Sequence, residues 1–159
     1  MQGIMFKPFF IPAIENGEKT QTRRLIKTGN NIAEFPLNDG GSLYDRITGD
    51  FIRNINPRYK VGKIYYCRSN YSLAAKDATV FVRITGVRCE KLQSISHDDC
   101  IAEGINSKHL EHIMHKYGWA NPRKRFEALI NNINGKDTWR DNPFVWVYNF
   151  ELLEVKCKQ

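Results

Sequence analysis

The run Thr79–Glu90, TVFVRITGVRCE, constrains the fold of this chain more than any other segment. Branched and aromatic residues alternate along it with a period of two, which predicts a long β-strand. Gly86 lies inside the run and indicates a bulge or a close approach of another backbone. A second run, Pro143–Glu154, predicts another long strand, and it places four aromatic residues on one face: Phe144, Trp146, Tyr148 and Phe150. The chain must therefore build at least one sheet from segments far apart in sequence.

Shorter elements precede and separate these two runs. The composition of three segments predicts strands: Ile4–Phe10, Lys19–Ile26 and Lys63–Arg68. Start and stop residues predict four helices, at Pro12–Asn16, Ser96–Gly104, Lys108–Tyr117 and Pro122–Asn134. The strands are too few and too separated for a doubly wound sheet. We therefore predict an α+β fold, a small mixed β-barrel with flanking helices.

Two of these helices carry strong local signals. Ser96 and Asp99 have the spacing of a capping box, with Asp in place of Glu. Asn121 is a natural cap before Pro122. In that last helix apolar residues recur at helical spacing and predict a face that packs on the core: Phe126, Leu129, Ile130 and Ile133.

The length of 159 residues fits a single domain covering 1–159, with an irregular insertion at about 27–57. This insertion is rich in Gly, Asn and Asp, and a hairpin around Leu43–Arg53 with Thr48 and Gly49 at its turn is its clearest local feature. A long irregular segment in a small domain is typically functional, so we expect it to act as a lid or a binding element.

Composition narrows the environment and the partners. The formal net charge is +7, from 24 Lys and Arg against 17 Asp and Glu, which favours an anionic partner, although solubility alone also explains such a charge. No stretch approaches the about 20 apolar residues that cross a bilayer. Four scattered cysteines are typical of a reduced compartment, and we expect a cytoplasmic protein without a membrane partner.

No metal site or cofactor is predicted. The four cysteines, at 67, 89, 100 and 157, have no knuckle spacing. His109, His112 and His115 fall every third residue, a spacing that turns around a helix instead of facing one ion, so a solvated helix face is the better interpretation.

The densest polar cluster follows Gly17 and has two interpretations. It contains Lys19, Thr20, Thr22, Arg23 and Arg24. Arg side chains bind phosphates with two parallel hydrogen bonds, and a Lys adds a point charge, so the cluster predicts an anion site. A solvated basic strand that resists aggregation explains the same residues.

The same cluster holds the groups for nucleophilic catalysis. The Thr22 hydroxyl attacks a carbonyl only if a base such as Lys19 removes its proton, which requires a lowered Lys pKa. In a regular strand positions three apart face opposite ways, so the pair requires a turn or bulge near Lys19–Gln21. Glu103 ends a predicted helix, where the helix dipole disfavours a carboxylate, so it is either solvated and idle, the usual case, or compensated by a cation. Lys19 as that cation would make the two an acid–base pair.

Aromatic and basic side chains elsewhere are candidates for ligand contacts. Trp139, in the run GKDTWRDNP, and Tyr71 are predicted to stack on bases. Arg68 is predicted to contact a phosphate backbone. Trp146, on a strand face, is predicted to be in the core.

Four segments resemble ASCH-domain proteins of the phage-associated type, members of the PUA-like superfamily. They are GEKTQTRR, YKVGKIYYCR, ITGVRCEKLQSISHDDCIAEGI and INGKDTWRDNPFVWVYNFELLE. The resemblance covers most of the chain outside about 27–57. It departs at Tyr66–Tyr71, where such relatives have a Trp-Val-Arg-Glu-x-Trp run, so one carboxylate and two tryptophans are missing here.

The resemblance implies a small β-barrel with flanking helices that binds RNA or modified nucleosides in a cleft. One branch hydrolyses the acetyl amide of N4-acetylcytidine; matched onto this chain, Lys19 is the proton acceptor, Thr22 the nucleophile and Glu103 the proton donor. Another branch is described as a ribonuclease, which is the weaker match.

Three functions follow as alternatives. The first is hydrolysis of the amide of an N4-acylated cytidine by Lys19, Thr22 and Glu103, with Thr20, Arg23, Arg24, Arg68, Tyr71 and Trp139 as ligand contacts. The second is non-catalytic binding of RNA or a modified base in the same cleft. The third is a phage assembly or counter-defence protein with a protein partner.

Overall fold

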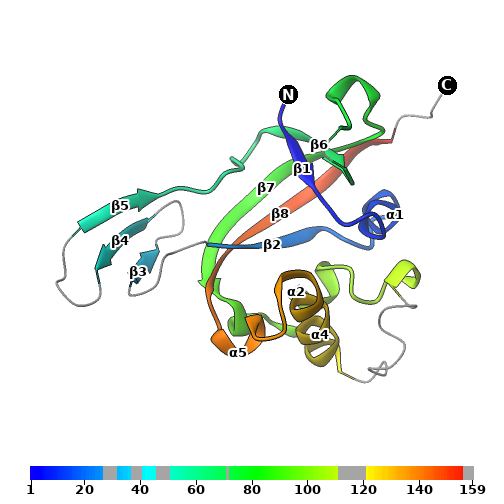
Figure 1. Ribbon diagram of the computed structural model, residues 1–159. Coiled ribbons are helices and arrows are strands. Elements are labelled where there is room, and N and C mark those ends of the chain that lie inside the picture. Colours follow the sequence, from blue (N-terminus) through cyan, green and yellow to red (C-terminus); the bar gives the residue numbers. More distant parts are fainter. Residues whose placement is uncertain (27–31, 37–40, 46–50, 71, 111–120, 156–159) are drawn as a thin grey trace.

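The computed structural model describes residues 1–26, 32–36, 41–45, 51–70, 72–110 and 121–155. Its main sheet has the strand order β1-β6-β7-β8-β2 (Figure 1). The strands are β1 (Gly3–Met5), β6 (Ile64–Arg68), β7 (Val80–Lys91), β8 (Phe144–Val155) and β2 (Gln21–Leu25). β1 pairs with β6 in parallel and the other pairs are antiparallel, so the sheet is mixed, as predicted.

The two long strands β7 and β8 pair along their length and form the centre of the sheet. Their register shifts between Ile84 and Gly86, which confirms the bulge predicted at this glycine. A Cβ atom at Gly86 would lie 3.2 Å from the side-chain nitrogen of Asn149, so the paired strand also approaches closely there.

The predicted barrel is not closed. β1 and β2 are the two edges of the sheet, and no strand pairing joins them among the described residues. β1 has only three residues, after which the chain turns through Pro8, which has no amide hydrogen to donate, into α1 (Phe10–Glu15). One side-chain bond spans the seam, from Arg24 Nη2 on β2 to the carbonyl of Met5 on β1, at 2.5 Å. The fold class is α+β, with an open curled sheet in place of the barrel.

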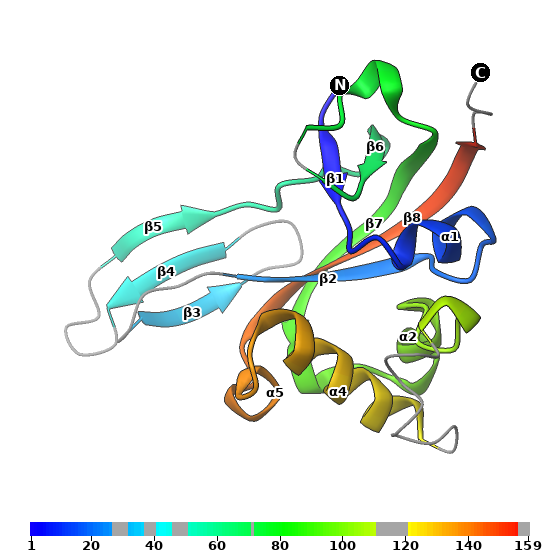
Figure 2. The same ribbon diagram turned by 45° about the vertical axis from the view of Figure 1, so that its right-hand side comes forward.

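Helices gather against the lower part of this sheet in Figures 1 and 2. They are α2 (His97–Ala102), α4 (Pro122–Asn134) and α5 (Thr138–Asp141). The predicted caps are confirmed, since Ser96 accepts a hydrogen bond from the Asp99 amide and Asn121 accepts one from the Lys124 amide.

The described residues also form three single turns of 3₁₀ helix: η1 (Ala75–Asp77) between β6 and β7, η2 (Leu92–Ser94) and η3 (Lys108–Leu110). Of the helix predicted at 108–117, only η3 belongs to the described residues; the remainder, with His112 and His115, lies outside them.

The predicted insertion contains a second antiparallel sheet, β3 (Ile32–Pro36), β4 (Gly41–Asp45) and β5 (Phe51–Ile55). The predicted hairpin is confirmed, because Leu43 pairs with Arg53. β3 was not predicted, and the expected turn at Thr48 and Gly49 lies outside the described residues. This small sheet projects to one side of the main sheet in both ribbon views.

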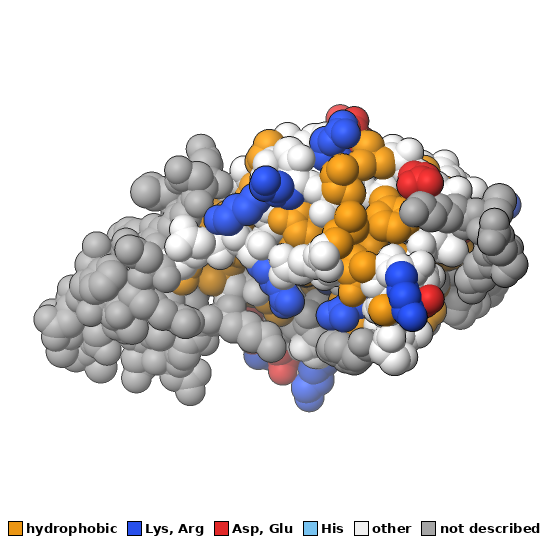
Figure 3. Space-filling model, turned by 90° about the horizontal axis from the view of Figure 1, so that it is seen from above, with side chains coloured by type: hydrophobic (Ala, Val, Ile, Leu, Met, Phe, Trp, Pro, Cys, Tyr) orange, Lys and Arg blue, Asp and Glu red, His pale blue; other side chains and the backbone are white. Residues whose placement is uncertain are grey.

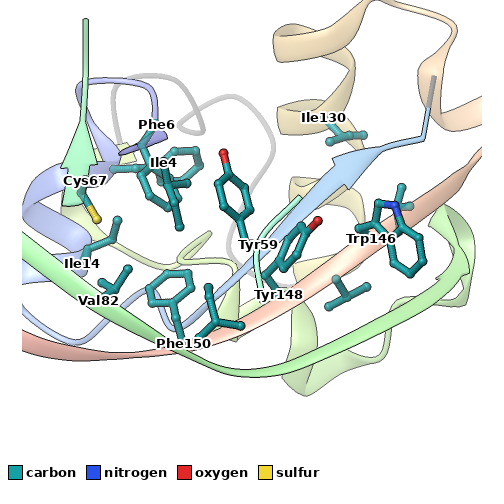
Figure 4. Close-up of a cluster of buried hydrophobic side chains, with 14 of the residues drawn as sticks. Ile4, Phe6, Ile14, Tyr59, Cys67, Val82, Ile130, Trp146, Tyr148 and Phe150 are labelled. Atoms are coloured by element: carbon teal, nitrogen blue, oxygen red, sulfur yellow. The ribbon is translucent and has the colours of Figure 1, made fainter. Parts of the chain in front are cut away.

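Aromatic residues fill the concave side of the main sheet (Figure 4). Tyr148 on β8 is buried and stacks edge-on against Tyr59, which contacts Tyr65 in the same way. The Tyr148 hydroxyl accepts a hydrogen bond from the Arg58 amide, 3.0 Å away. The segment after β5 is thereby attached to the sheet. Trp146 is buried, as predicted.

Candidate functional site

A buried ion pair joins the segment just before β2 to the end of α2. Lys19 Nζ donates to the Glu103 carboxylate at 2.8 Å and to the Glu103 backbone carbonyl at 2.7 Å. Both side chains are at least nine-tenths buried, and Lys19 Nζ also lies 4.3 Å from the centre of the Phe10 ring. The sequence left Glu103 either solvated and idle or compensated by a cation, and the structure shows it buried and paired with Lys19.

The backbone around Lys19 explains how Lys19 and Thr22, three positions apart, reach the same side. β2 begins only at Gln21, and before it the amide of Lys19 donates to the carbonyl of Ala13 and the amide of Thr20 to that of Ala102. Lys19 therefore precedes the regular strand, so the two-residue alternation of side chains that applies to Thr22 does not apply to Lys19.

Gly104 permits the close contact between these segments. Its φ of +80° belongs to the left-handed region, and a Cβ atom there would lie 2.9 Å from Lys19 Cβ. No heavier residue fits this position without moving the backbone that carries Lys19 or Glu103.

Arg23 links three carboxylates behind the pair. It donates to Glu103 at 3.1 Å, to Glu90 at 2.6 Å and to Asp99 at 2.8 Å, and also to the Gln21 side chain. Asp99 accepts further bonds from Gln21 at 2.8 Å and Arg88 at 2.5 Å. Sequence analysis predicted Arg23 as a ligand contact; the structure shows it engaged in holding the acidic residues in place.

Burial and the charges of this network shift the pKa values of Lys19 and Asp99. Burial lowers the pKa of Lys19 below its ordinary value of 10.5, against the opposing attraction of Glu103. For Asp99 burial favours the neutral acid, but hydrogen bonds from Gln21 and Arg23 and the charge of Arg88 outweigh it and lower the pKa.

A cavity of about 350 Å³ opens beside the pair, at the seam between the two edge strands. Its polar lining includes three predicted catalytic residues, Lys19, Thr22 and Glu103, together with Arg23 and Arg24. The structure thus brings the three predicted catalytic residues to one cavity. Thr22 is buried, and among the described residues its hydroxyl has no hydrogen-bond partner.

The remaining walls are largely apolar. Residues 5–10, between β1 and α1, supply one side, including Phe6 and Phe10. The core-facing side of α4 supplies the other with Phe126, Leu129, Ile130 and Ile133. The periodicity of α4 predicted a face that packs on the core. It could not show that part of this face lines a cavity, because core packing and cavity lining require the same apolar spacing.

Three other predicted contacts, Thr20, Arg68 and Trp139, are not part of the cavity lining. Thr20 is exposed, and Arg68 is half-buried at the end of β6. Trp139 lies on α5 and packs edge-on against Phe126, with the Arg123 guanidinium 5.2 Å from its ring centre. Tyr71 lies outside the described residues. For these four, a ligand contact stays a prediction.

The part of the chain that the structure describes contains no group of three metal-ligating side chains. Nor does it contain a helix long and apolar enough to span a bilayer. The view from above in Figure 3 shows hydrophobic side chains gathered on that face, with Lys and Arg side chains more prominent around them than Asp and Glu.

Comparison with known proteins gives two solved structures of similar shape. A protein of the DUF984 family from Enterococcus faecalis V583 is 11% identical, with a TM-score of 0.48, over 100% of this chain and 84% of that one. An ASCH domain from Lactobacillus crispatus JV V101 is 15% identical, with a TM-score of 0.42, over 89% and 68% of the two chains. No family model and no curated protein matches the sequence.

Proposed function

We propose that this protein hydrolyses the amide of an N4-acylated cytidine, with Thr22 as nucleophile, Lys19 as base and Glu103 as acid. One observation carries the proposal: the buried Lys19–Glu103 pair and Thr22, whose hydroxyl has no partner in the part of the chain that the structure describes, line the same cavity. These are the residues to which the resemblance to the amidohydrolase branch of ASCH proteins assigns the chemistry. Neither the pair nor Thr22 needs a cofactor for acyl transfer.

Proton transfer within the pair prepares the reaction. Lys19 accepts a proton only as a neutral amine, and desolvation moves its pKa in that direction. Passing the Lys19 proton across the 2.8 Å hydrogen bond to Glu103 produces a neutral amine and a neutral acid at no change in total charge. This form of the pair has a base and an acid ready at once.

Acyl transfer then follows in two steps, acylation of Thr22 and hydrolysis of the ester. Thr22 Oγ1 attacks the acyl carbonyl and its proton passes to Lys19 Nζ. The C–N bond breaks as Glu103 gives its proton to the departing N4 nitrogen, releasing cytidine and leaving an ester on Thr22. Water then attacks the ester and gives a proton to the Glu103 carboxylate, while Lys19 gives its proton to Thr22 Oγ1 as the ester C–O bond breaks. The carboxylic acid is released, and the free threonine, the neutral Lys19 and the protonated Glu103 are restored.

The cavity suits a ligand of this class. Its volume of about 350 Å³ falls within the range of small-molecule sites. Phe6 and Phe10 contribute aromatic surface on one side, and α4 contributes aliphatic surface on the other, both of which favour a planar base over bulk water.

A release assay tests the reaction. Purified protein is incubated with N4-acetylcytidine and the cytidine formed is measured by chromatography, for wild type, Thr22→Val and Lys19→Ala. Thr22→Val removes only the hydroxyl and should abolish turnover. Thr85→Val makes the same change at an exposed position of β7 and should leave turnover intact. Turnover that survives in Thr22→Val would refute the mechanism.

A second candidate is non-catalytic binding of RNA or a modified base in the same cavity. It is favoured by the two hydrogen bonds that already engage Lys19 with Glu103, as in a purely structural pair. In that case no cytidine is released, and wild-type protein binds a short single-stranded RNA with an affinity that falls steeply with salt. Retained RNA binding in Thr22→Val would accompany this result.

A further inference from the structure

Arg24 is a cation at the cavity that the proposed reaction does not use. It lies on β2 two residues after Thr22, so both side chains project from the same side of the strand. Its described contacts are the bond to the Met5 carbonyl at 2.5 Å and the Phe6 ring, 5.2 Å from the guanidinium carbon. No carboxylate lies within ion-pair distance of it among the described residues.

This state contrasts with that of its neighbours. Arg23 shares three carboxylates and Lys19 has one, so both are compensated within the protein. Burial opposes the charged form of Arg24 and lowers its pKa, and the opposing attraction of Tyr59 and Glu103 does not outweigh the loss of water. A guanidinium has five N–H donors, and one of them is engaged with Met5.

The cavity lining carries more positive than negative side chains. Four of its side chains are cationic, Lys7, Lys19, Arg23 and Arg24, against the single carboxylate of Glu103. The other acids of the network, Glu90 and Asp99, face Arg23 from outside the lining. A ligand that fills the cavity therefore meets a surplus of positive charge at Arg24.

We infer that the ligand of this cavity is an anion, whose phosphate or carboxylate group binds the free N–H donors of Arg24. The inference rests on the cavity assigned in the proposed function and adds the charge of the substrate. Residues two apart on a strand are separated by about 7 Å, so the anionic group lies about that far from the carbonyl that Thr22 attacks. A nucleotide phosphate and a carboxylated acyl chain both meet this requirement.

The first experiment probes the anion site without any nucleoside. Melting temperatures are measured with increasing inorganic phosphate, and separately acetate, at constant ionic strength, for wild type, Arg24→Gln, Arg24→Lys and the exposed Arg83→Gln. Wild type and Arg83→Gln should be stabilised by at least one of the two anions. Arg24→Gln should lose this response and Arg24→Lys should keep part of it. Equal responses in wild type and Arg24→Gln would overturn the inference.

The second experiment identifies the source of the anion. Binding to Thr22→Val protein is compared for cytidine 5′-monophosphate against cytidine, and for N4-succinylcytidine against N4-butyrylcytidine. We expect about 10- to 100-fold tighter binding of the anionic member in one pair, lost in the Thr22→Val, Arg24→Gln double variant. No preference in either pair would overturn the inference.

The two proposals fail separately. Release of cytidine from N4-acetylcytidine without any anion response at Arg24 would leave the reaction standing and remove the anion site. An Arg24-dependent phosphate or acetate response without release would leave the anion site standing and remove the reaction.

Discussion

Lys19 Nζ lies 2.7 Å from the backbone carbonyl of Glu103 and 2.8 Å from its carboxylate, so one ammonium group holds both the helix end and its side chain. A buried ammonium needs such partners because its loss of water otherwise costs several kcal/mol. The pair therefore attaches α2 to the start of β2, and it also supplies the acid and base of the proposed reaction. Stability and activity are coupled here, and the following predictions separate them.

Replacing Glu103 with Gln should destabilise the protein by about 3–5 kcal/mol, since Lys19 and Arg23 both lose a buried counter-charge. Urea unfolding at pH 7 measures the change. The matched control is Glu151→Gln, which removes a half-exposed ion pair to Arg83 and should cost at most about 1 kcal/mol. Equal losses in the two variants would contradict the role given to the buried pair.

Gly104→Ala should destabilise more than Gly17→Ala. Both glycines have positive φ, +80° and +71°, so both variants suffer the backbone strain of about 1 kcal/mol. At Gly104 the new Cβ atom also meets Lys19 Cβ at 2.9 Å, whereas Gly17 has nothing within 4 Å. The difference between the two unfolding free energies measures the close approach alone, and we expect about 1–3 kcal/mol.

Acid should weaken the fold through Asp99. Its pKa is lowered in the folded state, so the unfolded chain binds a proton more readily than the native protein. The stabilisation is complete above the unfolded value of about 3.9 and is lost as the pH falls through the lower folded pKa. In Asp99→Asn, urea midpoints at pH 7, 5, 4 and 3 should decline less at the acid end than in wild type. Parallel curves would show that other carboxylates control acid unfolding.

The proposed hydrolysis should slow toward alkaline pH. The reactive Lys19–Glu103 pair carries one proton, which Glu103 gives to the departing N4 nitrogen, and loss of that proton to the solvent leaves a base without an acid. Burial lowers the pKa of Lys19, so kcat/KM should fall with rising pH through an inflection below 10.5. Initial rates of cytidine release between pH 6 and 10 measure this profile. A rate that rises throughout this range would argue against the shared proton of the pair.

Local patterns predicted the elements where short-range physics decides. The alternation along 79–90 and the bulge at Gly86 follow from the two-residue repeat of a strand and from the missing side chain of glycine. The caps at Ser96 and Asn121 follow from hydrogen bonds within one turn. The strand β3 was not predicted because its pairing with β4 depends on both segments and neither segment shows it alone.

The sequence by itself determined the candidate reactive groups, a Lys, a Thr and a Glu in segments that resemble an ASCH domain, and it left open whether Glu103 is solvated or paired with a cation. Only the tertiary structure decided which cations serve it, because Lys19 and Arg23 reach Glu103 across 84 and 80 positions of chain. It also decided that Arg23 binds three carboxylates whereas Arg24 has none within ion-pair distance among the described residues, although the two are neighbours in sequence and both line the cavity. The physical reason is the geometry of a strand: successive side chains point to opposite faces, and segments far away in sequence supply the groups that each face contacts.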